Sequence, residues 1–298
     1  MLVLMDYFLN FAALISAFTW AITSVVFKTI NLKNVLSFPF YEAIVSFLLL
    51  SVFITFFYGW DLIFRQNLDS LFIFVIGTST GCIGFICYVI SIRKIPIGIA
   101  LTLSACSSIL TILLLDYFLN LFIYNWLVLF GSFLILMSIF LLNFEYIFSN
   151  TPKMKNSSYS GMFYSLAAGL IWGFATYLND LALNHALFVD AALARTIVWV
   201  ILPSLITICI RRNFDFIPDN KVHSFKIILA AILATVSTFF WFIALNRTTG
   251  FLSVIMSNSA PIFALIIGYV FLREKISKYQ TLGIFISFSG ILIVIMFR

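Results

Sequence analysis

Three ionisable side chains interrupt apolar stretches that are long enough to span a membrane: Glu42, Asp116 and Arg195. A charge at the centre of a bilayer costs at least about 2.5–3.5 kcal/mol on insertion scales, so each of them needs a reason to be there. Arg195 could bind the carboxylate of a zwitterion, and Glu42 could bind its ammonium group or a transported proton. The alternative is that each lies near a helix end and extends to water. That alternative is favoured for Asp116, which is closer to the end of its stretch.

Small polar residues gather halfway along two other apolar stretches. They are Ser104, Ser107 and Ser108 in residues 97–117, and Ser257, Asn258 and Ser259 in residues 251–272. Pro261 follows directly and has no N–H, so its helix loses one backbone hydrogen bond there. Interrupted helices at matching depth in two halves of a chain indicate a binding site at the membrane midplane. Close helix packing by small residues explains the same pattern equally well.

Several aromatic residues lie more than one helical turn inside their apolar stretches. They are Trp20, Tyr88, Trp172, Tyr177 and Trp241. Tryptophan and tyrosine usually lie at the membrane interface, so deeper ones need a polar partner or a cavity. We therefore expect these five either to line a substrate path or to belong to the core.

The elements that carry these residues follow from the composition. Hydrophobic residues make up 63% of the 298 residues and charged residues 9%, with a mean hydropathy of +1.14. A soluble domain of this size needs about a quarter of its residues charged. Continuous apolar runs predict spanning helices and not barrel strands. There are ten such runs: 7–27, 37–57, 71–92, 97–117, 124–144, 161–180, 187–210, 225–245, 251–272 and 279–297.

Several classes of function are disfavoured. The net charge of +6 comes from basic residues in short loops, which report orientation in a membrane protein and do not form a nucleic-acid-binding face. The sequence has no HExxH, no P-loop and no paired Asp-rich motif, so we expect no enzyme, no cofactor and no metal site. A membrane-embedded lipid enzyme would need convergent acidic or histidine residues that are lacking here.

The sequence matches itself when it is shifted by 152 residues. The matching pairs include Trp20 with Trp172, Gly98 with Gly250, Ser107 with Ser259, Tyr117 with Tyr269, and Gly131 with Gly283. This predicts two halves, 1–150 and 151–298, with five helices each. Five is odd, so the second half must be inverted in the membrane. Inverted repeats are typical of transporters that work by alternating access, although such a duplication can also be only a scaffold.

At this point the chain resembles the EamA-type members of the drug/metabolite transporter superfamily. The resemblance rests on Pro261, the REKIS turn with Glu274, Gly283 and Gly290, Trp20 and Trp172 in the first helix of each half, Arg195 in LARTIVW, and the stretch from Tyr88. The first half departs from the pattern. When the sequence is shifted by 152 residues, Phe122 aligns with Glu274 and Ala43 aligns with Arg195. The resemblance implies an all-α integral membrane protein with ten transmembrane helices in two inverted five-helix repeats, and no cofactor.

Members of that family carry amino acids out of bacteria, take up S-adenosylmethionine, or move sugars and other metabolites. The resemblance therefore implies a multi-pass secondary transporter of the bacterial inner membrane, foremost for an amino acid or a related small polar compound. It would be coupled to protons or to a counter-substrate, and would be a monomer or a weak homodimer. A carrier for S-adenosylmethionine and a flippase for lipids or lipid-linked sugars are the alternatives. The sequence leaves the substrate, the direction and the coupling ion open.

Two arguments about orientation disagree. The loops after odd-numbered spans hold most of the Lys and Arg, for example Arg211, Arg212 and Lys221. Because cytoplasmic loops carry the excess of basic residues, this places both termini outside. The resemblance instead implies that both termini are cytoplasmic.

Overall fold

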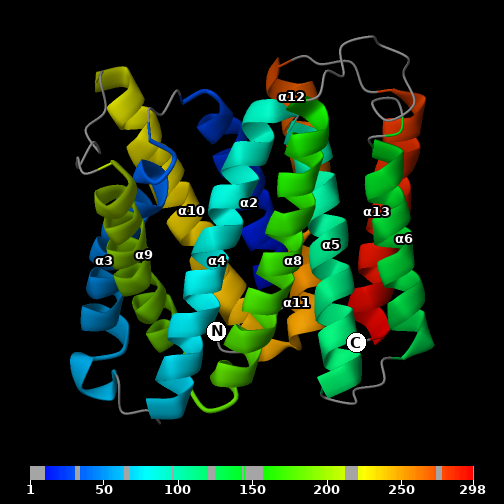
Figure 1. The fold of residues 1–298 in the computed structure, drawn as a ribbon. Helices are drawn as coiled ribbons and strands as arrows, with labels where there is room; N and C mark the ends of the chain where they lie inside the picture. Colours follow the sequence, from blue (N-terminus) through cyan, green and yellow to red (C-terminus); the bar gives the residue numbers. More distant parts are fainter. Residues whose placement is uncertain are drawn as a thin grey trace.

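A computed structural model describes residues 11–30, 34–63, 68–95, 97–119, 125–142, 144, 157–211, 221–272 and 277–297. Every regular element in these ranges is helical (Figure 1). The helices are α2 Ala12–Lys28, α3 Ser37–Phe57, α4 Leu68–Lys94, α5 Ile97–Leu119, α6 Trp126–Leu142, α8 Ser157–Leu183, α9 Phe188–Arg211, α10 Lys221–Arg247, α11 Gly250–Ser257, α12 Ala260–Leu272 and α13 Lys278–Phe297, with the 3-10 turn η1 Trp60–Leu62. The charged turn at 273–275 and Phe122 lie outside the described residues.

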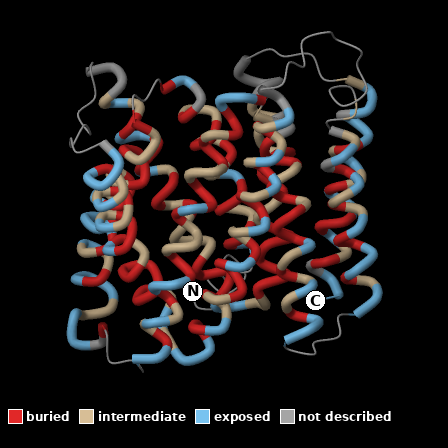
Figure 2. The backbone as a smooth tube through the Cα atoms, in the orientation of Figure 1, coloured by how far each residue is buried: buried red, intermediate tan, exposed pale blue. Residues whose placement is uncertain are grey.

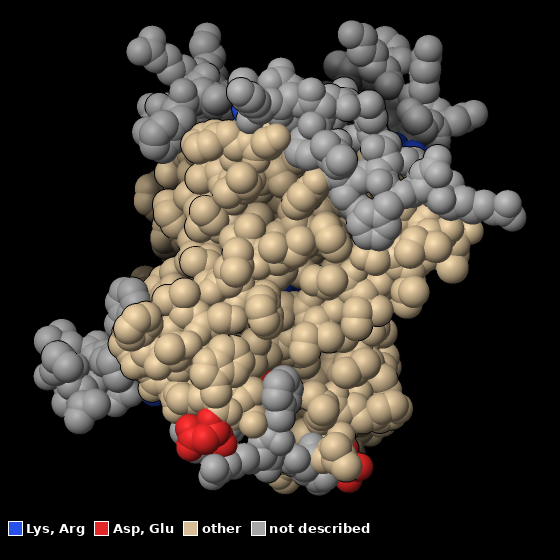
Figure 3. Space-filling model, turned by 90° about the vertical axis from the view of Figure 1, so that its left-hand side faces the viewer, with Lys and Arg blue, Asp and Glu red and all other residues tan. Residues whose placement is uncertain are grey.

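Helix lengths and surfaces show a multi-pass membrane protein. Within the described residues, α3, α4, α5, α8, α9 and α10 are long and apolar enough to cross a membrane, and the other apolar helices are shorter. Large apolar side chains such as Leu48, Phe56 and Phe133 are more than half exposed on the outside of the bundle. The face in Figure 3 has a broad central belt almost without charge, and its acidic side chains lie at the lower end. This surface matches a lipid environment.

The ten apolar runs predicted from the sequence all overlap helices. The ninth is divided, as the position of Pro261 suggested: α11 ends at Ser257 and α12 begins at Ala260. The expectation of an equivalent interruption in the first half is wrong, because α5 runs without a break from Ile97 to Leu119. Its serines donate hydrogen bonds to carbonyls of their own helix, which a continuous helix accommodates.

Helices from the two halves of the chain pair with each other. The closest pairings are α4 with α8, α6 with α13, α5 with α8, α2 with α10, and α3 with α9. The pair of α6 and α13 stands at one side of the bundle in Figure 1 and has few contacts with the remaining helices. Buried residues run along the inner faces of the other helices (Figure 2). The core therefore lies between the two halves.

Glycines allow the closest of these approaches. A Cβ on Gly131 of α6 would lie 2.9 Å from the carbonyl oxygen of Gly290 in α13, and a Cβ on Gly290 would lie 2.7 Å from that of Gly131. Gly131 and Gly290 thus let the backbones of α6 and α13 approach closely. Small residues at such crossings bring two backbones together in a membrane, where no hydrophobic effect drives helices together.

We expect Gly290→Leu to separate α6 from α13 and to lower the apparent melting temperature of the purified protein. Overpacking a tight contact costs about 1–3 kcal/mol, and here the obstacle is backbone that no rotamer change can remove. Thermal unfolding in detergent measures the effect. Ser289→Leu is the matched control, because Ser289 is the exposed neighbour on the same helix. An equal shift in both variants would contradict the role of the glycine contact.

Candidate functional site

A cavity of about 200 Å³ lies between the two halves of the bundle. Residues of α2, α4, α5, α8, α9, α10 and α11 form its wall, and the wall combines aromatic rings with small polar groups. The cavity is smaller than the ~300–1,000 Å³ of typical ligand pockets, so a small molecule would fill it. The wall residues are Ser16, Ala17, Trp20, Gly77, Thr78, Gly81, Phe85, Ser108, Trp172, Ala175, Thr176, Asn179, Arg195, Trp199, Ser237, Thr238, Trp241, Phe242, Val254, Ser257 and Asn258.

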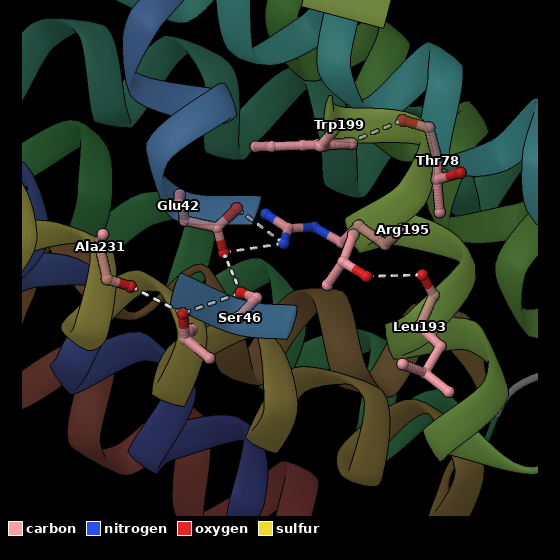
Figure 4. Close-up of polar contacts among 9 residues, drawn as sticks. Glu42, Ser46, Thr78, Leu193, Arg195, Trp199 and Ala231 are labelled. Atoms are coloured by element: carbon pink, nitrogen blue, oxygen red, sulfur yellow. Dashed lines mark hydrogen bonds and ion pairs between the residues drawn. The ribbon is translucent and has the colours of Figure 1, made fainter. Parts of the chain in front are cut away.

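A buried ion pair stands at one side of this cavity. Nη1 of Arg195 in α9 donates to both carboxylate oxygens of Glu42 in α3, at 2.8 and 2.9 Å (Figure 4). The Glu42 side chain is 0% exposed and that of Arg195 is 11% exposed. The prediction that both face the interior is confirmed, and the alternative that they extend to water is wrong. Arg195 reaches the cavity wall, whereas Glu42 lies behind it.

Both members of the pair are held by neighbouring groups. Ser46 Oγ donates to Glu42 Oε1 at 3.0 Å and lies 2.8 Å from the hydroxyl of Thr235 in α10. The Arg195 guanidinium lies over the Trp199 ring, 3.7 Å from its centroid, and this contact adds a cation–π attraction. Trp199 Nε1 donates to the carbonyl oxygen of Thr78 in α4 (Figure 4). The guanidinium is therefore fixed between three helices before any ligand binds.

Two tryptophans from equivalent positions of the two halves meet in the wall. The rings of Trp20 and Trp172 lie 6.3 Å apart in an edge-on arrangement. Trp172 Nε1 donates to the carbonyl oxygen of Gly81 at 3.1 Å, which satisfies its polar end. Tyr88 packs on both rings from the side but is not part of the wall. It is 1% exposed and belongs to the core.

The break between α11 and α12 is tied to the first half. Asn258 Nδ2 donates to Ser108 Oγ at 2.8 Å, and both residues line the cavity. Ser104 and Ser107 of the same helix as Ser108 are buried and donate to the carbonyl oxygens of Leu101 and Leu103. These two serines face the close packing of α5 on α8, not the cavity.

The structure divides the ten residues that the sequence suggested. Five lie in the cavity wall: Trp20, Trp172, Arg195, Trp241 and Asn258. The other five are buried but lie outside this wall: Glu42, Tyr88, Ser104, Ser107 and Tyr177. The expectation that Asp116 extends to water is wrong, because this residue is 2% exposed. Its helix ends only at Leu119, and the residue lies on the inward face.

Sequence reasoning missed much of the polar wall. Gly77 and Gly81 of α4 lie close to α8, and both also line the cavity. Asn179 of α8 also belongs to this wall, and an amide inside a spanning segment is a signal that the sequence offers. Within the described ranges, no three His, Cys, Asp or Glu side chains come together as metal ligands.

This chain is similar to a family of transporters, to individual transporters and to a solved structure. Residues 8–144 and 159–296 each match the EamA-like transporter family. An uncharacterised transporter of Archaeoglobus fulgidus is 24% identical over 216 residues, which is 72% of either chain. One from the sor 3′ region of Acidianus ambivalens is 37% identical over 67 residues, 22% of this chain and 26% of that one. A crystal structure shares the fold, with a TM-score of 0.75 at 14% identity over 98% of both chains.

Proposed function

Because this chain belongs to the EamA-like transporter family, we propose that it carries a small zwitterionic metabolite, an amino acid or a close relative, across the membrane by alternating access. The observation that carries this proposal is the buried Arg195–Glu42 pair at the wall of a small aromatic cavity. It acts as a secondary transporter and not as an enzyme. Coupling is to a proton or to a counter-substrate.

The cavity suits a zwitterion better than a net anion. Arg195 presents a guanidinium, whose flat fork of donors matches a carboxylate. Its charge is already balanced by Glu42 at 2.8 Å. A dicarboxylate or a phosphate would bring uncompensated negative charge into a site of low dielectric constant, which is costly. A zwitterion adds no net charge, and its side chain can rest against the tryptophans.

The proposal includes a topology. The ten apolar helical segments, with α11 and α12 together forming the ninth, make two five-helix repeats, 1–150 and 151–298, inverted relative to each other. The pairing of helices across the halves supports this arrangement. Figure 1 also supports an even number of membrane-spanning segments, because α2 begins and α13 ends at the same end of the bundle. We place the protein in a bacterial inner membrane, as a monomer or a weak dimer.

Uptake by proteoliposomes tests the proposed function. The purified protein is reconstituted and offered labelled amino acids, S-adenosylmethionine, a sugar and a dicarboxylate, with and without an imposed proton gradient. We expect accumulation of at least one amino acid above empty liposomes, stimulated by the gradient or by unlabelled substrate on the far side. Transport restricted to the dicarboxylate, or movement only of a labelled lipid, would overturn the proposal.

A further inference from the structure

Asn179 of α8 has an unsatisfied carbonyl group at the cavity. The residue lines the cavity and is 3% exposed. Its Oδ1 atom accepts no hydrogen bond from any group that the structure describes. A buried acceptor without a donor destabilises a fold, so such groups are rare and need an explanation. Of the described buried side-chain atoms in this condition, Asn179 Oδ1 is the one that belongs to a wall residue.

Gly77 of α4 provides the space for this amide. A Cβ on Gly77 would lie 2.9 Å from Asn179 Oδ1 and 3.2 Å from its Cγ. The amide oxygen therefore occupies the space that a side chain at position 77 would take. The χ2 torsion of asparagine has a broad energy profile, so a modest rotation can turn the carbonyl toward a ligand. The Oδ1 atom is therefore buried beside the backbone of α4 and receives no hydrogen bond there.

Other wall hydroxyls are already engaged with the protein. Thr176 donates to the carbonyl oxygen of Trp172, Ser257 to that of Ser253, and Ser237 to that of Ser16. Glu42 is occupied by Arg195 and lies outside the wall. A hydroxyl that donates can still accept, so Asn179 differs from these groups in that its Oδ1 atom is fully buried and has no donor among the described groups.

The surroundings of the cavity favour a positive group. The C-terminal end of α11, which carries partial negative charge, contributes Ser257 to the wall. Pro261 has no N–H to offer the carbonyl of Ser257 four residues earlier. The rings of Trp20, Trp172 and Trp241 can also attract a cation. An ammonium group in this cavity gains from each of these features.

We propose that Asn179 accepts a hydrogen bond from the ammonium group of the transported zwitterion and thereby selects substrates with a free amino group. This assignment rests on the proposed function and adds to it a second polar contact, distinct from Arg195. It also replaces Glu42, which the sequence suggested for the ammonium group, by a residue that lines the cavity.

The test compares two ligands in the wild type and three variants. The probes are the amino acid with the highest uptake in the panel above and its analogue without the amino group; for leucine this is 4-methylpentanoate. Binding is followed through the tryptophan fluorescence of the full-length protein in detergent. We expect Asn179→Ala to raise the Kd of the amino acid by about 10- to 100-fold and to leave the Kd of the analogue unchanged. Asn179→Asp should keep the preference for the amino acid.

Asn184→Ala is the matched control, because Asn184 is exposed just beyond the end of α8. It should bind both probes as the wild type does. Parallel weakening of both probes in Asn179→Ala, or no weakening of either, would overturn the role of Asn179 while the proposed function stands. The ratio of the two constants does not depend on the folded fraction. A wild-type protein that binds no amino acid would instead overturn the proposed function, and this assignment with it.

Discussion

Arg195→Gln will reduce the kcat/KM of uptake by about 100-fold, because the substrate carboxylate loses its charged donor in a desolvated site. The same change leaves Glu42 buried at 0% exposure without its counter-ion. Removing one partner of a buried pair costs about 3–5 kcal/mol of stability. Uptake by proteoliposomes measures the first effect, and thermal unfolding in detergent measures the second. Arg195→Lys should keep part of the stability but little transport, because lysine lacks the planar fork.

A double substitution separates the two effects of Arg195. In Glu42→Gln/Arg195→Gln no charge is left without a partner, so we expect stability to return toward the wild-type value. Uptake should stay low, since the carboxylate still has no guanidinium to bind. Recovery of both stability and uptake would show that Arg195 only holds the helices together. Uptake within twofold of wild type in the single Arg195→Gln variant would remove the residue from the site altogether.

Trp20→Ala and Trp172→Ala should each lower uptake by about 10-fold while the protein still inserts into the membrane. Each change opens the cavity and removes an edge-on ring contact of 6.3 Å. Replacing a packed tryptophan by alanine costs about 3–5 kcal/mol, of which part is lost ring packing. Trp172→Phe should be milder, since it keeps a ring and loses the hydrogen bond to the carbonyl oxygen of Gly81.

Trp126→Ala is the control for the tryptophan variants. Trp126 begins α6 and is 69% exposed, far from the cavity wall. Its uptake and its level in the membrane should match those of the wild type. If Trp20→Ala and Trp172→Ala show unchanged uptake kinetics as well, the two rings belong to the core and not to the transport path.

The helices could largely be predicted from the sequence, because a helix that spans a membrane needs about 20 consecutive, mostly apolar residues. Continuous apolar runs predicted segments that the structure shows as helices, and Pro261 indicated the division between α11 and α12. The ends of helices were less certain: α4 and α8 each extend beyond the apolar run that predicted them. Polar residues can continue a helix into the interface, so hydropathy alone does not mark its end.

The site was only partly predictable from the sequence. The burial of a side chain, and whether it faces the cavity, depend on which helices pack against each other. Arg195 and Glu42 were recognisable as charges in apolar surroundings, but their mutual contact joins α3 to α9, a pairing that periodicity does not give. Ser107 and Ser108 are adjacent in sequence, yet only Ser108 faces the cavity. The amide of Asn179 is visible in the sequence as a polar group in a spanning segment, but its close contact with Gly77 on another helix is not.

The ion pair also has a consequence for synthesis on the ribosome. Glu42 and Arg195 are 153 residues apart in the chain. At about 5–20 residues per second, roughly 8–30 s pass between the synthesis of the two residues. During that time α3 must be held in or near the membrane with a carboxylate that has no counter-ion. The buried position of Glu42 is therefore neutralised only after the part of the second half that holds Arg195 has been made.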